Sequence, residues 1–170
     1  MLYLAMFQIT EFADSRNKSW CIHCGSWLSQ TDTRKDHVPT KGLLLKPFPA
    51  NLPVVEICQI CNSRFSRDEE YLIAFLSSVV SGSTDPERQT VPLAKSILAR
   101  SPKLRSRIEG SKKVERTLSG EKDIKWEPEW DRIYLIVLKN ARGHAYFEMA
   151  EPMLMEPTHV VSAPLQTLSS

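Results

Sequence analysis

Residues 21–62 read CIHCGSWLSQTDTRKDHVPTKGLLLKPFPANLPVVEICQICN and contain all four cysteines of the 170-residue chain. The cysteines form two C-x-x-C pairs, Cys21 with Cys24 and Cys58 with Cys61, and 33 residues separate the pairs. Two thiolates at positions i and i+3 of a tight turn can bind one ion, and two such pairs complete a tetrahedral zinc site. The segment is rich in turn-forming residues, so it predicts a small fold that a metal stabilises.

Disulfides or free thiols are the alternative interpretation of the four cysteines. Residues 1–9 are apolar, but they have no basic n-region and no small-residue cleavage site, so a secretory signal is not expected. We expect a cytoplasmic, reducing location, where disulfides do not persist, and this favours zinc. The longest apolar stretches, 71–80 and 133–138, are shorter than the roughly 20 residues needed to cross a bilayer. No membrane association is therefore expected.

Several polar residues lie in and just beyond the loop between the two pairs. Asp36-His37 precedes Val38-Pro39, Asn51 lies further along, and Asn62 follows the last cysteine directly. Because zinc with four sulfur ligands has no open position, catalysis is expected in this loop and not at the zinc.

This order of residues resembles the HNH endonuclease family, in the branch where cysteine pairs frame the active site. The shared pattern is C-x-x-C, then Asp-His before a hydrophobic residue and Pro, then Asn, then C-x-x-C followed by His or Asn. The match covers residues 21–70. The resemblance implies an α+β fold that begins with a zinc-stapled ββα-metal module. In that module Asp36-His37 would end the first strand, residues 54–57 would form the second, and Asn62 would lie in the first helical turn.

The resemblance also implies an activity and a set of site residues. It implies a metal-dependent endonuclease that hydrolyses phosphodiester bonds in DNA, by nicking or double-strand cleavage, with one catalytic divalent metal and structural Zn²⁺. His37, Asp36, Asn62 and Asn51 would be the catalytic residues. Asp36 and Asn62 would offer hard oxygen ligands, which suit Mg²⁺ or Mn²⁺. His37, with an ordinary pKa of about 6.5, would be the general base, and the loop of Asn51 would supply a carbonyl that orients it. An ordinary turn asparagine is the alternative reading of Asn51. Two other functions stay open: a non-catalytic zinc-ribbon module that binds nucleic acid or a protein partner, and a ribonuclease.

Basic residues surround the predicted centre in the sequence. Each is a candidate for a phosphate contact and, alternatively, a solvated surface charge. The candidates are Arg34, Lys35, Lys41, Arg64 and Arg67. The sequence predicts neither base specificity nor an oligomeric state.

The chain divides by composition into three segments. Residues 15–80 hold the predicted nuclease module, whose helix is expected from about Asn62 to Ser81 because apolar residues recur there at a helical period. Residues 81–125 are predicted to be a helical extension or linker, with short helices that begin at Pro92 and Pro102. Residues 77–125 carry a formal net charge of +5, which could follow a phosphate backbone or form solvated helix faces.

Residues 126–170 form the third segment. Residues 126–150 favour an amphipathic helix, although the run Ile-Tyr-Leu-Ile-Val-Leu at 133–138 would also suit a buried strand. Residues 159–161 look strand-like. We therefore expect a C-terminal helix and a short strand, which could belong to an incomplete domain.

Overall fold

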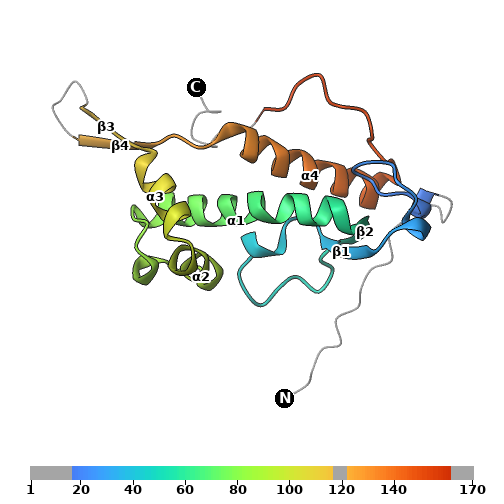
Figure 1. Cartoon of the computed structure of the whole chain (residues 1–170), viewed down its shortest axis with the longest axis horizontal. Helices are drawn as coiled ribbons and strands as arrows, with labels where there is room; N and C mark the ends of the chain where they lie inside the picture. The colour runs from blue at the N-terminus through green and yellow to red at the C-terminus, as the bar shows by residue number, and fades with distance from the viewer. Residues whose placement is uncertain (1–16, 117–121, 162–170) are drawn as a thin grey trace, which may run out of the picture. The chain divides into compact units, whose positions relative to one another are not determined.

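The computed structural model describes residues 17–116 and 122–161 (Figure 1). The fold is mixed α+β, with four α-helices and two small antiparallel sheets in the described part. The chain forms two compact units. One contains residues up to 66 together with those from 134 onwards, and the other contains residues 67–133. These bounds differ from the three consecutive segments drawn from composition.

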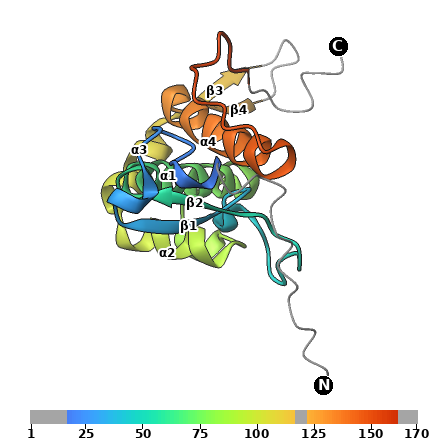
Figure 2. The same ribbon diagram turned by 90° about the vertical axis from the view of Figure 1, so that its right-hand side faces the viewer.

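The first unit contains a β-hairpin of β1 (Thr33–His37) and β2 (Val54–Cys58). The strands pair antiparallel from Thr33↔Cys58 to His37↔Val54. Successive side chains of a strand point to opposite faces, and on β2 this places Val55 and Ile57 in the core and leaves Glu56 exposed. The alternation of Val, Glu and Ile therefore fixes which face of the hairpin is buried. Figure 2 shows the two strands of this hairpin side by side.

Helix α1 (Gln59–Ser81) follows β2 without a loop. The backbone N–H of Gln59 donates to the Asp32 carbonyl at 2.8 Å, which ties the start of the helix to the start of β1. The helix begins three residues before the predicted start at Asn62. It ends as the sequence predicts, because Gly82 has a φ of +65° and the Ser83 N–H returns to the Ser78 carbonyl.

The second unit contains two short helices, α2 (Pro92–Arg100) and α3 (Pro102–Gly110). Both begin at a proline, as predicted, since proline has no N–H to leave unpaired in a first turn. Apolar side chains of both helices are buried. They are Ala94, Ile97, Leu98 and Ile108.

Residues 81–125 also contain part of a β-hairpin that the sequence-based description as a helical extension missed. Strands β3 (Lys112–Arg116) and β4 (Lys122–Trp126) pair antiparallel, with Val114 opposite Ile124. Each strand has few apolar residues among charged ones, so no period of two is visible in the sequence. The Trp126 ring contacts the Phe75 ring edge-on, with centroids 6.4 Å apart.

Helix α4 (Trp130–Met149) confirms the helical reading of residues 126–150. The alternative strand at 133–138 is wrong. The helix ends before Ala150, which has a φ of +58°. The expected short strand at 159–161 is also wrong, because those residues have neither helical nor strand structure, and residues 162–170 lie outside the described ranges. Among the described helices, none combines the length and apolar character that spanning a membrane requires.

Candidate functional site

The first cysteine pair lies in a tight turn. The Gly25 N–H donates to the Cys21 carbonyl and the Cys21 N–H donates to the Ser26 carbonyl, both at 2.8 Å. Gly25 has a φ of +73°, a left-handed conformation that glycine adopts without steric cost. On either side of the turn, Trp20 and Trp27 form a β-bridge, and their rings meet edge-on with centroids 5.0 Å apart. The turn thus holds Cys21 and Cys24 close together.

The second pair is held by the junction of strand and helix. Cys58 is the last residue of β2, and Cys61 lies in the first turn of α1. The Cys61 backbone N–H donates to the Cys58 sulfur at 3.4 Å. This contact holds the two cysteines of the pair next to each other at the start of the helix.

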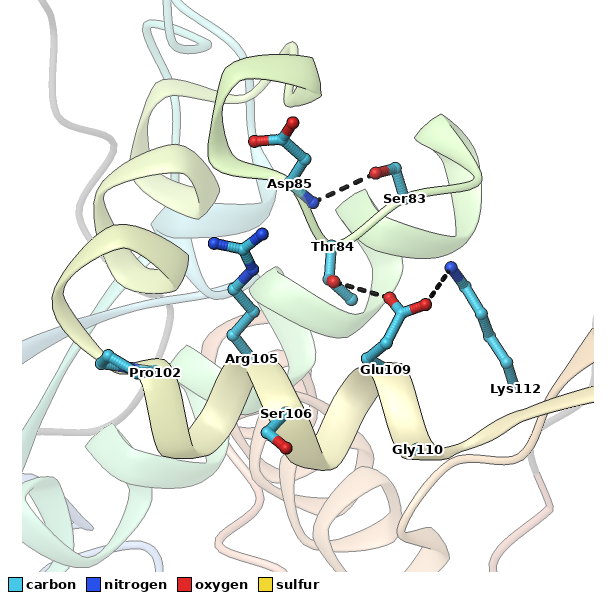
Figure 3. A pocket seen from close by; sticks show the side chains of 9 residues that line it. All are labelled: Ser83, Thr84, Asp85, Pro102, Arg105, Ser106, Glu109, Gly110 and Lys112. Atoms are coloured by element: carbon cyan, nitrogen blue, oxygen red, sulfur yellow. Dashed lines mark hydrogen bonds and ion pairs between the residues drawn. The ribbon is translucent and has the colours of Figure 1, made fainter.

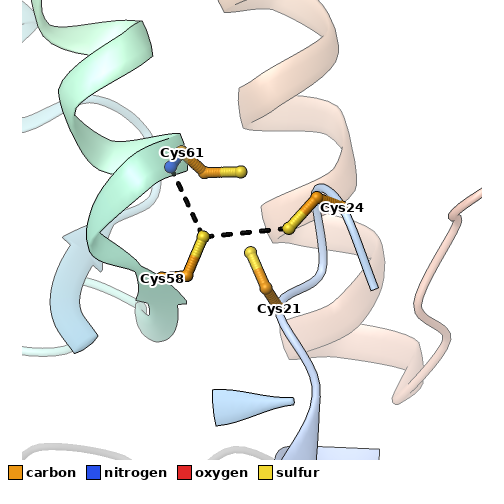
Figure 4. A group of neighbouring side chains, drawn as sticks. All are labelled: Cys21, Cys24, Cys58 and Cys61. Carbon is orange, nitrogen blue, oxygen red and sulfur yellow. Dashed lines mark hydrogen bonds between the residues drawn. The ribbon is translucent and has the colours of Figure 1, made fainter. Parts of the chain in front are cut away.

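The four sulfur atoms converge (Figure 4). All lie within 4.8 Å of one another, and the Cys24 and Cys58 sulfurs are 3.8 Å apart. Tetrahedral zinc with Zn–S bonds of about 2.3 Å places its sulfurs about 3.8 Å apart. Cys21, Cys58 and Cys61 are buried, whereas Cys24 is exposed. The cluster can therefore bind a metal ion such as zinc, as the two C-x-x-C pairs predict.

Ionisation of the four thiols is coupled to such binding. Burial raises the pKa of Cys21, and burial together with the neighbouring cysteines raises the pKa of Cys61. Burial also acts to raise the pKa of Cys24, but hydrogen bonds with Ser26, Cys61 and Cys21 together outweigh it and bring that pKa to about 7. Four adjacent thiolates repel one another, and a dication removes that penalty. Metal binding should therefore release protons from the buried thiols.

The predicted catalytic residues lie on the elements expected for them. Asp36 and His37 are the last two residues of β1, opposite Val55 and Val54. Asn62 lies in the first turn of α1 and is partly buried. Asn51 is exposed in a turn that precedes β2. In the described ranges the His37 ring makes no hydrogen bond, so the orienting carbonyl expected from the loop of Asn51 is not found.

The electrostatic surroundings of His37 favour the neutral imidazole. Its side chain is partly buried. Burial lowers the pKa of His37 below its ordinary 6.5, and the positive charges of Lys41 and Lys139 lower it further. A neutral imidazole is the form that can accept a proton.

The structure adds a residue that the sequence did not predict. The Lys139 ammonium group on α4 donates to Oδ1 of Asp36 at 2.7 Å. The two side chains are 2% and 11% exposed, so this is a buried ion pair. A lysine among the apolar residues of a predicted amphipathic helix was the available signal, but its partner lies 103 residues away in sequence.

Two further contacts join α4 to the chain segment after β1. The backbone N–H and the hydroxyl of Thr40 donate to Asn140 Oδ1 at 3.0 and 3.2 Å. A Cβ added to Gly143 would lie 2.5 Å from a methyl group of Val38. The helix therefore approaches Val38 closely because residue 143 has no side chain.

No protein-family model matches the chain, and no curated protein or solved structure is significantly similar to it. The assignment of a function therefore rests on the residues and their chemistry.

A cavity of about 140 Å³ adjoins the cysteine cluster in the first unit. Cys24 and Cys61 line it together with Arg64, Lys139 and Arg142. Zinc bound by four thiolates carries two net negative charges, so the basic side chains would balance that charge. His23 also lines this cavity; its ring contacts the Phe65 ring edge-on, with centroids 4.7 Å apart.

The predicted phosphate contacts are all exposed side chains. Arg34, Lys35, Lys41 and Arg64 belong to the first unit, and Arg67 belongs to the second. The Lys41 ammonium lies 4.7 Å from the centroid of the Phe48 ring. Exposure is compatible with binding phosphates and equally with solvation.

A second cavity, of about 660 Å³, lies in the second unit (Figure 3). Glu109 accepts a hydrogen bond from Thr84 and pairs with Lys112, each at 2.6 Å. These contacts lower the pKa of the Glu109 carboxyl group, with Lys112 the larger cause. Thr84, Glu109 and Lys112 therefore satisfy one another, and these contacts contribute to the structure of the unit.

Proposed function

We propose that this chain is an HNH-type endonuclease that hydrolyses phosphodiester bonds in DNA. The observation that carries the proposal is the position of Asp36 and His37. They end the first strand of a β-hairpin, and the second strand ends at Cys58 and runs directly into a helix with Asn62 in its first turn. A non-catalytic zinc ribbon, which only presents a binding surface, does not require this combination of a carboxylate, a neutral histidine and an amide side chain.

The roles follow from the chemistry of the side chains. Asp36 and Asn62 would hold one Mg²⁺ or Mn²⁺ ion, which would neutralise charge on the phosphate and on the leaving oxygen. His37 would accept a proton from the attacking water. The four-cysteine cluster, with zinc bound, would hold the two ends of the hairpin and would take no part in the chemistry, since its four positions are filled.

One observation favours a second candidate, the non-catalytic zinc-ribbon module. Asp36 already has a cation at hydrogen-bond distance, the Lys139 ammonium, and this pair is buried. A buried carboxylate that is paired in this way can have a structural role in the fold and no catalytic role.

Cleavage of supercoiled plasmid DNA by zinc-loaded protein separates the two candidates. With added Mg²⁺ or Mn²⁺ the wild type should nick or linearise the plasmid, and EDTA should abolish this. His37→Ala should fold and keep its zinc but lose at least about 100-fold in rate, the usual contribution of a general base. His144→Ala is the matched control, because His144 is an exposed histidine of α4 outside the proposed centre.

Single-stranded DNA and RNA are tested in parallel. Cleavage of RNA alone would replace the DNA assignment with the ribonuclease. If folded wild type cuts none of the three substrates, the zinc-ribbon module becomes the better account.

A further inference from the structure

The ion pair between Lys139 and Asp36 involves one of the two ligands proposed for the catalytic metal. The lysine side chain is 2% exposed, and its ammonium donates to Asp36 Oδ1 at 2.7 Å. It also lies 3.4 Å from the Thr40 hydroxyl. A full positive charge therefore already contacts the carboxylate that would bind Mg²⁺ or Mn²⁺.

The position of this lysine is fixed by its neighbours on the helix. Asn140 accepts two hydrogen bonds from Thr40, and Gly143 lies against Val38. These residues and Lys139 occupy consecutive turns of one helix and contact the short segment 36–40. Lys139 therefore keeps its contact with Asp36 unless its own side chain changes conformation.

Two opposing effects of Lys139 on metal binding can be compared. A hydrogen bond to a ligating carboxylate orients it, and losing such a partner typically weakens metal binding. Lys139, however, also brings a full positive charge to the Asp36 carboxylate. An ammonium and a divalent ion on one buried carboxylate repel each other, and the low local dielectric strengthens that repulsion. Repulsion should therefore outweigh orientation.

We infer that Lys139 sets the divalent-metal requirement of the proposed centre, because its ammonium competes with the metal for Asp36. This inference rests on the metal ligands of the proposed function. Lys139 is then a positioning residue, and its removal should strengthen metal binding. Removal of a residue that only orients a metal ligand would instead weaken metal binding.

Binding of Mn²⁺ to zinc-loaded protein, followed by the loss of the free-ion electron paramagnetic resonance signal, tests this directly. In Lys139→Met the half-saturating Mn²⁺ concentration should fall by at least about 10-fold, the lower end of effects seen for groups next to a metal ligand. Lys139→Arg retains the charge and should stay close to wild type. A higher half-saturating Mn²⁺ concentration in Lys139→Met would mean that Lys139 orients Asp36 for the metal. An unchanged concentration would mean that Lys139 has no influence on metal binding. Either result overturns the inference.

The variant leaves Asp36 buried without its cation, so its folding is followed as well. Mn²⁺ should raise the melting temperature of Lys139→Met more than that of wild type, because the metal replaces the missing charge. The double variant Asp36→Asn, Lys139→Met removes both charges and should show no Mn²⁺ response. If Lys139→Met is unfolded and Mn²⁺ does not restore its fold, the inference fails.

Plasmid cleavage by the same proteins distinguishes this failure from failure of the nuclease proposal. Cleavage by wild type with no change in Mn²⁺ binding in Lys139→Met would refute the role of Lys139 and leave the nuclease intact. The expected shift in Mn²⁺ binding without cleavage by any variant would support the role of Lys139 and refute the nuclease.

Discussion

At the scale of single residues, adjacent side chains in the sequence have different surroundings. Asp36 is buried and paired with Lys139, whereas the neighbouring His37 is partly exposed, as expected for successive residues of a strand. Sequence order was enough to predict that both residues end β1. It was not enough to predict Lys139, because only the tertiary fold brings residues 36 and 139 together.

The pKa shift of His37 leads to a prediction for the pH dependence of cleavage. Burial, Lys41 and Lys139 all lower the pKa of His37, so the neutral, proton-accepting form persists below pH 6.5. The acid limb of kcat/KM should therefore lie below about pH 6.5, the ordinary histidine value. Measuring kcat/KM for DNA cleavage from pH 5 to 8 at saturating metal would locate this acid limb.

Charge variants then test the cause of this shift. Lys41→Gln should move the acid limb upward, towards the ordinary histidine value. Lys35→Gln is the control, since Lys35 is not among the causes of the shift. An acid limb above pH 6.5 in wild type would contradict the assignment of His37 as the base.

Among the helices and strands, those whose formation depends on neighbouring residues in the sequence could be predicted, and those that depend on distant contacts could not. The starts of α2 and α3 were predictable because Pro92 and Pro102 act within a single turn. The hairpin β3–β4 was missed because its charged strands carry no apolar alternation. Helix α4 was predictable from its periodicity, but its contact with the segment after β1 depends on Gly143, whose fit against Val38 no local pattern reveals.

The close approach at Gly143 leads to a prediction for stability. In Gly143→Ala the new methyl group would lie 2.5 Å from Val38, so the backbone or Val38 must move. Overpacking of this kind costs about 1–3 kcal/mol, more than the roughly 0.5–1 kcal/mol that alanine normally contributes in place of glycine in a helix. The midpoint of urea unfolding should therefore fall.

Gly110→Ala is the matched control, because a Cβ there meets no atom within 4 Å. It should leave the midpoint unchanged or raise it. Adding Val38→Ala to Gly143→Ala should recover part of the loss if the clash is its cause. A Gly143→Ala protein as stable as wild type would show that α4 does not approach Val38 in this way.

In the molecule as a whole, all four cysteines lie in one of the two units. The sequence predicted their convergence from spacing alone, and the structure places all four sulfurs within 4.8 Å. The sequence did not predict that residues after 134 belong to the same unit as the cysteines, because that assignment depends on contacts between distant segments. The second unit, residues 67–133, contains no cysteine.

Loss of the metal should therefore affect the two units unequally. Cys58→Ser, or treatment of wild type with a strong chelator, should reduce zinc below one ion per chain and expose the amides of β1 and β2 to hydrogen exchange. Amides of α2 and α3 should keep more of their protection. Equal loss of protection in both units would mean that they unfold together, and unchanged protection would mean that zinc does not hold the hairpin.

The proposed nuclease requires a divalent metal bound to Asp36 and Asn62 beside His37, apart from a structural zinc. Anomalous diffraction from crystals of zinc-loaded His37→Ala, grown with Mn²⁺ and a DNA duplex, would locate both metals. We expect a zinc peak among the four cysteine sulfurs and a separate manganese peak bound to Asp36 and Asn62. Crystals in which Asp36 keeps its contact with Lys139, and no manganese peak lies beside it, would rule out the proposed metal site.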